Sequence, residues 1–309
     1  MIHGGGRTSP PAAAFFRAMS APLPVLVARN AMATRFEFAL HGDDPVRLRA
    51  AAEEALDEVG RWEDLLSLYR PHTDIARVNA GAAAGPVRVA PEVMGLLQRA
   101  FALTAATGGA FDITAAPLVR AWGFMDGTGS RPSPPVLAEA LACVGPRHVE
   151  LDAVAGTVRF SRPGVMLDLG SVGKGWALGR AAELLGEAGI TGALLHGGTS
   201  TVVAIGAPPD AERWKVALPD GCEVELRDEA LSVSATWGKS FSDGGRIHGH
   251  VLDPRCGMPV TGGRMAAVAL PSSADSDALS TAVLVRGEEG LAELGAAFPG
   301  IRTWIASRS

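Results

Sequence analysis

Lysine is scarce in this chain of 309 residues. Only Lys174, Lys215 and Lys239 occur, so most of the positive charge is carried by arginine. The formal net charge is −5, which excludes nucleic-acid binding through a general excess of positive charge. Any anion site must therefore be local, and a lysine inside a motif is the first residue to consider for it.

The chain also has few cysteines and no long apolar run. The cysteines Cys143, Cys222 and Cys256 are few and widely spaced, which excludes a disulfide framework or a zinc knuckle and favours free thiols. No stretch approaches the roughly 20 apolar residues that cross a bilayer, so we expect no transmembrane segment. The hydrophobic content of 47% is nevertheless ample for a buried core.

Residues 1–30 have the composition of a flexible N-terminal leader. They contain three consecutive glycines and several prolines, and their apolar patch is too short and interrupted for a secretory signal. No cysteine precedes Cys143, so we expect no lipid anchor and a cytoplasmic location; a misassigned start would favour an extracytoplasmic one. Residues 31–309 contain no repeat or linker that divides them, and we expect a single domain there.

From residue 31 onward, helical and strand patterns are mixed. Residues 34–40 alternate like a half-buried strand, and residues 151–160 predict a hairpin. Helices are predicted over residues 45–59, 92–107 and 178–188, and further strands over residues 149–151, 158–160, 165–169, 193–195, 202–205, 214–218 and 265–270. Pairs of neighbouring strands favour an α+β fold with mainly antiparallel sheets over a strictly alternating parallel one.

The first segment that suggests chemistry runs from Asp168 to Gly175, between an apolar run and a predicted helix. Its glycines let the backbone approach a ligand, and a helix start presents unpaired N–H groups to an anion. It is not a P-loop, which needs glycine at 168 and serine or threonine at 175. A tight turn alone would explain the glycines, but the scarce Lys174 near Asp168 favours a nucleotide or phosphate contact.

Asp277 and Thr281 are four residues apart where the last long helix is expected to begin, so they share one of its faces. A carboxylate and a hydroxyl are hard oxygen ligands, which suit Mg²⁺ better than zinc. The alternative is that Asp277 only stabilises the helix N-terminus, and spacing alone favours this alternative.

Residues 108–114 contain a glycine pair that would end the preceding helix, followed by Phe111 and Asp112. An aromatic ring and an acid directly after such a turn are typical of a pocket for a flat heterocycle with hydrogen-bonding edges. Packing of the ring in the core explains the same residues equally well.

His250 directly precedes a turn built on Asp253, Pro254 and Gly257. His248 and His250 have the spacing of a zinc pair, but no third ligand is nearby, which excludes that site. A catalytic or substrate-contacting role for His250 and a purely structural one both remain open.

Together these segments resemble the ApbE family, the Mg²⁺-dependent FAD:protein FMN transferases. The resemblance covers nearly all of residues 31–306 and keeps the order of the family's motifs. The matching segments are residues 32–34, residues 66–70 with 75–79, and residues 109–112, 168–175, 250–254 and 277–281.

The resemblance implies an ApbE-like (T-fold-like) fold with helices packed on the sheets and a central FAD cleft. It implies that FAD is the substrate and that its contacts include Met32, Tyr69, Ala110, Phe111, Asp112, Asp168, Lys174 and Val251. It also implies Mg²⁺ beside the FAD diphosphate, with Ser171, Asp277 and Thr281 as its ligands. Tyr69 is the only tyrosine of the chain, which suits a specific contact.

The implied reaction is attack by a threonine hydroxyl of an FMN-binding acceptor protein on the FMN-side phosphate of FAD, with release of AMP. Because this hydroxyl is a weak nucleophile, it needs a base. His250 is the first candidate for the base and Asp277 is its rival. The alternatives are an FAD pyrophosphatase that gives FMN and AMP, and a non-catalytic FAD-binding protein.

The chain departs from the usual family pattern in three places. Residues 196–200 read HGGTS where many members have Asn-Ala-Gly-Gly-Asp, and residues 234–237 read SATW where Ser-Gly-Asp-Tyr is common. Gly249 stands in place of the first of two histidines. Because the implied FAD and metal positions are unaffected, cofactor binding is better supported than transfer efficiency or the choice of acceptor.

Overall fold

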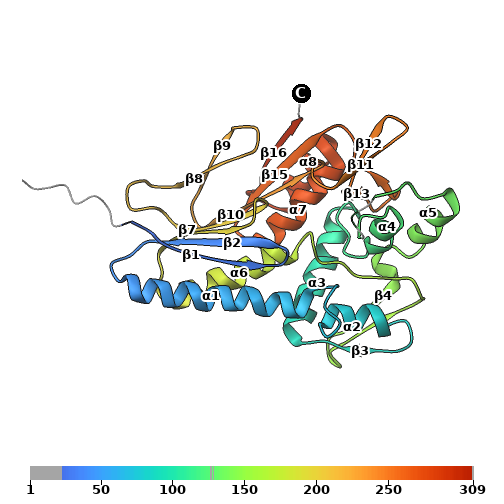
Figure 1. Cartoon of the computed structure of the whole chain (residues 1–309), viewed down its shortest axis with the longest axis horizontal. Helices are drawn as coiled ribbons and strands as arrows, with labels where there is room; N and C mark the ends of the chain where they lie inside the picture. The colour runs from blue at the N-terminus through green and yellow to red at the C-terminus, as the bar shows by residue number, and fades with distance from the viewer. Residues whose placement is uncertain (1–22, 126, 128, 308–309) are drawn as a thin grey trace, which may run out of the picture.

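An antiparallel sheet of seven strands forms the centre of the computed structural model, which describes residues 23–125, 127 and 129–307 (Figure 1). In spatial order the strands are β1 (Val25–Ala31), β2 (Thr34–Leu40), β6 (Gly192–Gly197), β7 (Thr201–Gly206), β10 (Glu229–Ala235), β15 (Arg264–Leu270) and β16 (Arg302–Ser307). Because β2 pairs with β6 and β6 with β7, the β1–β2 turn and the β6–β7 turn lie at the same end of the sheet.

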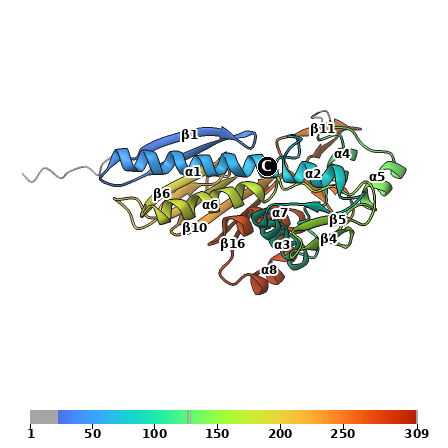
Figure 2. The same cartoon turned by 90° about the horizontal axis from the view of Figure 1, so that it is seen from below.

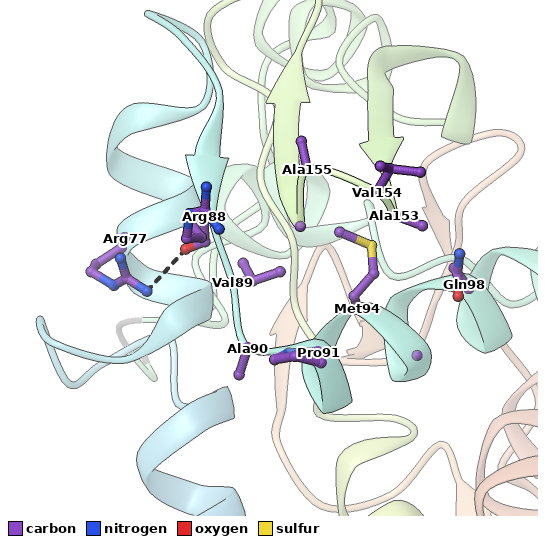
Figure 3. A pocket seen from close by; sticks show the side chains of 12 residues that line it. Arg77, Arg88, Val89, Ala90, Pro91, Met94, Gln98, Ala153, Val154 and Ala155 are labelled. Carbon is purple, nitrogen blue, oxygen red and sulfur yellow. Dashed lines mark hydrogen bonds between the residues drawn. The ribbon is translucent and has the colours of Figure 1, made fainter.

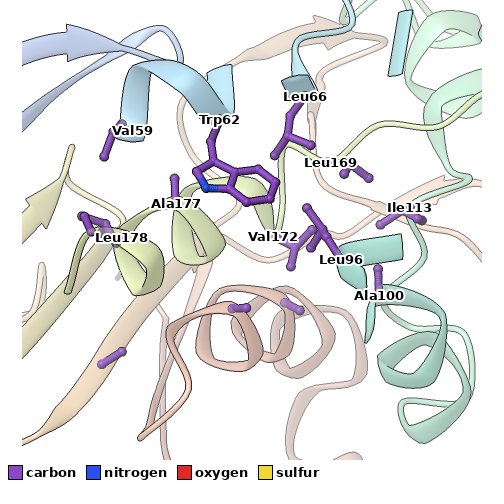
Figure 4. Close-up of a cluster of buried hydrophobic side chains, with 14 of the residues drawn as sticks. Val59, Trp62, Leu66, Leu96, Ala100, Ile113, Leu169, Val172, Ala177 and Leu178 are labelled. Carbon is purple, nitrogen blue, oxygen red and sulfur yellow. The ribbon is translucent and has the colours of Figure 1, made fainter. Parts of the chain in front are cut away.

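One face of the sheet is covered by the helices α1 (Pro45–Leu66), α6 (Gly173–Glu187) and α7 (Ser273–Arg286), which are seen from below in Figure 2. Helix α1 begins at Pro45 because the preceding Asp44 caps it with a side-chain oxygen. Trp62 of α1 is fully buried, and Figure 4 shows it beside Ala177 and Leu178 of α6. This layer forms the main hydrophobic core.

The opposite face of the sheet carries a second, smaller core. The hairpin of β8 (Trp214–Ala217) and β9 (Glu223–Leu226) packs on this face. Its alternate side chains contact the residues of β7, β10 and β15 that point away from the helices. Successive residues of a strand point to opposite faces, so β15 supplies Val268 to the main core and Ala267 to the smaller one.

A second lobe of shorter elements lies beside the sheet and its helices (Figure 1). Its helices are α2 (Asp74–Gly81), α3 (Pro91–Ala106), α4 (Ala116–Ala121) and α5 (Pro134–Leu141), with a small sheet of β3 (Val87–Arg88), β5 (Thr157–Phe160) and β4 (Val149–Asp152). The hairpins β11–β12 (Ser240–Asp243 and Arg246–Gly249) and β13–β14 (Leu252–Asp253 and Met258–Pro259) belong to it as well. Helix α8 (Leu291–Ala297) precedes β16.

The α+β class with mainly antiparallel sheets is confirmed, as are the strand at 34–40 and the hairpin at 151–160. Three boundaries were wrong. Residues 25–30, assigned to the leader, form most of β1 because they pair with β2; residues 1–22 lie outside the described part. Helix α1 extends seven residues beyond the predicted end at 59, and α6 begins at Gly173 rather than at 178.

The predicted strand at 165–169 was also wrong. These residues pair with none of the strands in the described ranges. Their backbone groups form hydrogen bonds instead with the side chain of Asn79 and with the main-chain oxygen of Ile113. The apolar segment therefore belongs to no sheet.

Within the described ranges, no helix combines the length and the apolar character needed to cross a membrane. All three cysteines are free: Cys143 is buried, and Cys222 and Cys256 are exposed.

Candidate functional site

The segment before helix α6 is held by a single side chain from a distant helix. Asn79 of α2 donates its amide N–H to the main-chain oxygen of Leu167 (2.9 Å) and accepts from the N–H of Leu167 (2.8 Å). The N–H of Asp168 donates to the main-chain oxygen of Ile113 (2.8 Å). These bonds satisfy backbone groups that lack a strand partner, and they fix the position of Asp168.

The loop that follows Asp168 divides its side chains between the core and the surface. Leu169 and Val172 are buried, and Figure 4 shows both in the cluster around Trp62. Asp168 and Ser171, each directly before one of these two residues, are only partly buried. Burial raises the pKa of Asp168, although the Gly170 N–H (2.8 Å from Oδ1) and the charge of Lys174 oppose the shift.

Helices α6 and α7 touch at a glycine. A Cβ at Gly175 would clash with the main-chain oxygen of Ser273 and would lie 2.6 Å from the Cβ of Asp277. Without a Cβ, the N–H of Gly175 reaches Asp277 Oδ2 at 2.9 Å, and Ser273 Oγ donates to the Gly175 oxygen at 2.6 Å. Glycine at 175 is therefore required by the close approach of the two helices.

Asp277 is a buried carboxylate at the N-terminus of α6. It is 4% exposed and lies in the second turn of α7, whose own cap is Ser272. Its carboxylate therefore stabilises the N-terminus of α6 rather than that of α7. Lys174 Nζ is 4.0 Å from Asp277 Oδ2 and donates to the Gly170 oxygen at 3.0 Å, so a cation also adjoins this carboxylate.

Hydroxyl groups surround the same turn of α7. Thr281 Oγ1 lies 3.1 Å from Ser234 Oγ of β10, and Ser234 Oγ lies 2.8 Å from Ser280 Oγ. Thr201 Oγ1, at the start of β7, lies 3.4 Å from Asp277 Oδ1. The end of the sheet thus presents oxygen atoms from two strands to one helix.

The donor set suits a hard cation. Asp277, Thr281 and Ser171 offer carboxylate and hydroxyl oxygens, which Mg²⁺ prefers. The part of the chain that the structure describes contains no group of three or more His, Cys, Asp or Glu residues that could hold a metal. A cation at Asp277 would therefore depend on hydroxyls and on ligands from a bound molecule, and metal binding remains a prediction.

The residues around Asp112 adjoin this centre through the bond between Asp168 and Ile113. Ala110 and Phe111 are fully buried in the main core, so their side chains serve packing. Asp112 accepts from the N–H and the hydroxyl of Thr114 (2.8 and 2.6 Å), and burial raises its pKa. A cavity of about 550 Å³ opens beside Asp112 and is also lined by Arg147 and Arg255.

His250 reaches the same end of the sheet through the chain that follows β10. Gly249 packs so closely on the main-chain oxygen of Thr236 that a Cβ there would lie 2.6 Å from it. His250 Nδ1 lies 3.1 Å from the main-chain oxygen of Lys239, and burial lowers the pKa of the ring. Val251, next in the chain, packs against the main core.

Met32 and Tyr69 lie on two loops near this end. Met32 and Ala33 form the β1–β2 turn with φ of 48° and 57°, a left-handed conformation that is uncommon outside glycine and asparagine. Tyr69 follows α1 and is 70% exposed. The last residue of α1, Leu66, approaches Gly173 at the start of α6, so the loop of Tyr69 begins beside that helix N-terminus.

The structure thus brings Asp168, Lys174 and Asp277 into one electrostatic group and ties Thr281 to it through α7. Met32, Tyr69 and His250 are placed on nearby loops. The cavity in Figure 3, about 690 Å³ between α3 and the β4–β5 turn, contains none of the predicted residues; there Arg77 donates to the Arg88 oxygen.

Two residues that make contacts at this site, Asn79 and Ser234, were not predicted from the sequence. Asn79 was part of a recognised motif, but its partner Leu167 is 88 positions away, and nothing local indicates that pairing. Ser234 fell in a segment noted only for its departures from the family pattern. The signal for Asn79 was its rarity, since the chain has only one other asparagine, Asn30.

Comparison with known proteins adds three findings. The model of the ApbE family matches residues 32–304. A Treponema pallidum protein named FAD:protein FMN transferase is 31% identical over 277 residues, which are 82% of this chain and 76% of that protein. The apo structure of the flavinyl transferase ApbE from Pseudomonas stutzeri has a TM-score of 0.81 at 28% identity and covers 94% of both chains.

Proposed function

The chain belongs to the ApbE family, and on that premise we propose that it transfers FMN from FAD to a threonine hydroxyl of an acceptor protein. The enzyme class, a flavin transferase, follows from the family and from the names of its relatives. The threonine target, the use of Mg²⁺ and the release of AMP are the finer parts of the proposal.

One observation is the main support for this proposal. Asp277 lies between the N-terminus of α6, 2.9 Å from the Gly175 N–H, and Lys174 Nζ at 4.0 Å. The diphosphate of FAD is an anion, and a helix N-terminus with an adjacent lysine favours its binding. A carboxylate at the same point would repel that anion unless a cation lay between them, which is why this arrangement supports a cation-dependent reaction.

The residues present fit Mg²⁺. Asp277, Thr281 and Ser171 would hold it, and when bound it would neutralise part of the diphosphate charge. Lys174 and the N–H groups at the start of α6 would bind the remaining phosphate oxygens and favour the charge that develops on them. Asp168, held by the bonds of its segment to Asn79 and Ile113, would orient the ribityl or phosphate end of the substrate.

The transfer itself forms one bond and breaks one. The threonine oxygen attacks the FMN-side phosphorus, the bond from that phosphorus to the bridging oxygen breaks, and AMP leaves with that oxygen. The proton of the threonine hydroxyl must pass to a base.

We propose His250 for that role, ahead of Asp277. Because the Lys239 oxygen can only accept, Nδ1 of His250 carries the proton and Nε2 keeps its lone pair. Burial lowers the pKa of the ring, so the ring is neutral at pH 7. Asp277, in contrast, already accepts from Gly175 and faces Lys174.

The remaining predicted contacts would bind the flavin nucleotide. The exposed ring of Tyr69 offers a flat surface, and Met32 and Val251 offer apolar atoms; the buried Ala110 and Phe111 could contribute only through their main chain. Asp112 would accept hydrogen bonds from the substrate.

The test is to incubate the protein with FAD and Mg²⁺, with and without an FMN-binding domain that carries a threonine in its flavin site. We expect AMP to form together with a covalent mass increase equal to FMN on the acceptor. AMP with free FMN and an unmodified acceptor would identify a pyrophosphatase, and bound but intact FAD would identify a non-catalytic binder. Either result would contradict the proposal.

A further inference from the structure

The hydroxyl groups between β10 and α7 have a fixed direction of hydrogen bonding, which can be derived from one carbonyl. Ser280 Oγ lies 2.8 Å from the main-chain oxygen of Asp277. A carbonyl oxygen only accepts, and a hydroxyl has a single proton. Ser280 therefore donates to Asp277 and has only lone pairs left for its other partner.

The next two bonds follow from the first. Ser234 Oγ lies 2.8 Å from Ser280 Oγ, so Ser234 must be the donor of that bond. Its only proton is then used, and Ser234 must accept in its 3.1 Å bond with Thr281 Oγ1. Thr281 is therefore the donor, and its proton is directed at Ser234 of β10.

We infer that Ser234 and Ser280 are positioning residues that hold the hydroxyl of Thr281 with its lone pairs free for a divalent cation. This inference rests on the proposed function, since it concerns the same site. A cation binds a lone pair of the oxygen, and a proton directed at it would oppose binding. Partners of metal ligands orient the ligands, and their loss lowers metal affinity by about 10- to 100-fold.

Ser234 is well placed to keep this orientation. It is partly buried in β10, where it pairs with Ala266 of β15, so the backbone beneath it belongs to the central sheet. Ser280 is fully buried. Without Ser234, the Thr281 proton would be free to turn toward the main-chain oxygen one helical turn before it, a bond that threonines in helices often make.

The chain supplies a matched control two residues away. Ser232 lies on the same strand and, by the alternation of strands, on the same face as Ser234. It is fully buried, and its Oγ has no hydrogen-bond partner among the described residues. Replacing Ser232 by alanine removes the same atom from the same strand face without touching Thr281.

The experiment is a titration of Mn²⁺ into the full chain with saturating FAD, following free Mn²⁺ by electron paramagnetic resonance. We expect Ser234→Ala to bind Mn²⁺ about tenfold more weakly and Ser232→Ala to bind it like the unmodified chain. Ser234→Thr, which keeps the hydroxyl, should restore most of the affinity. Circular dichroism checks that each variant is folded, and Ser280→Ala, expected to weaken binding as well, is a second probe of the same chain of bonds.

A double-mutant cycle separates orientation from a merely structural effect. Thr281→Val should weaken Mn²⁺ binding strongly, and adding Ser234→Ala to it should cost no further affinity, because Ser234 acts only through Thr281. Additive losses, or wild-type affinity in Ser234→Ala, would overturn the inference while leaving the proposed transfer intact. Failure of the unmodified chain to bind Mn²⁺ or to release AMP would overturn both.

Discussion

The centre formed by α6 and α7 and the hairpin that leads to His250 are held in different ways. The centre is part of the main core: Gly175 lets two helices touch, and buried Asp277 is bonded across that contact. Among the described residues, β11 and β12 pair only with each other. Their hairpin packs through aromatic rings, since Phe241 and His248 stack at 5.2 Å and Trp122 lies against both.

This difference indicates that the two regions would serve different parts of the reaction. Charge stabilisation works best with dipoles and charges that need no rearrangement, and the groups proposed for it lie in the buried centre. The proposed proton acceptor, His250, follows a hairpin that is attached to the rest of the protein by aromatic contacts. Changes in the centre should therefore affect stability and chemistry together, whereas changes at His250 should affect the chemistry alone.

The largest effect is expected at Asp277. Asp277→Asn keeps the shape of the side chain but removes its charge, and we expect turnover of FAD to fall about a thousandfold, because a catalytic metal ion contributes several kcal/mol. Initial rates of AMP release across a Mg²⁺ titration measure this. Asp275→Asn, two residues away in α7, breaks an ion pair with Arg99 and should lower stability while preserving the rate. Equal rates for Asp277→Asn and the unmodified chain would refute the cation site.

His250→Asn should have the next largest effect. Asparagine can still donate to the Lys239 oxygen, but its amide group cannot accept the proton of the threonine hydroxyl. We therefore expect the rate of transfer to fall about a hundredfold, as is common when a general base is lost. In the unmodified enzyme kcat/KM should fall with decreasing pH as the ring becomes protonated. Because burial lowers the pKa of His250, this decrease should lie on the acid side of the ordinary value of 6.5.

The measurement is a pH profile of kcat/KM for both proteins, with His72→Asn, an exposed histidine, as the control. The acid limb should disappear in His250→Asn and stay in the control. An unchanged limb in His250→Asn would assign the proton transfer to another group. Thermal stability at pH 7 should be nearly the same in all three proteins.

The same contrast explains which parts of the fold were predictable from sequence. Strands such as 34–40 follow from alternation, because one face is buried against a continuous core. Residues 165–169 have an equally apolar pattern, yet their backbone bonds go to Asn79 and Ile113, and no local pattern records such partners. Strand β1 was not predicted because the prolines just before it favoured a flexible leader. Its pairing with β2, which begins at Val25, makes it an edge strand of the sheet.

At the site, sequence order indicated the family and hence the identities of the charged residues, but not how they are arranged. The prediction that Asp277 would begin a helix was close, yet the helix that it stabilises is α6, which is distant in sequence. The direction of the Ser234 and Thr281 hydroxyls depends on a strand and a helix meeting in space. Contacts between distant segments are fixed by packing, so a single sequence does not reveal them.

A smaller effect, measured through the stability of the fold, is expected at the contact between α6 and α7. Gly175→Ala would force the helices apart, and overpacking of this kind costs about 1–3 kcal/mol of unfolding free energy. Gly186→Ala in the same helix has nothing within 4 Å of the new Cβ and should instead stabilise the protein, by about 0.5–1 kcal/mol. Urea unfolding of both variants measures the difference. If Gly175→Ala were as stable as Gly186→Ala, the close contact of the two helices would be wrong.

The smallest effect is expected at Asn79, which tests whether the rigid centre extends to Asp168. Asn79→Ala removes both bonds to Leu167 and should raise the Kd for FAD about tenfold, the equivalent of one to two ordinary hydrogen bonds. Asn30→Ala, at the other asparagine of the chain and exposed on β1, is the control and should bind FAD normally. Quenching of flavin fluorescence gives both constants. Because Asp168 is also held by Ile113, a loss far above tenfold would mean that Asn79 contacts FAD itself, and no loss would mean that the Ile113 bond alone fixes the segment.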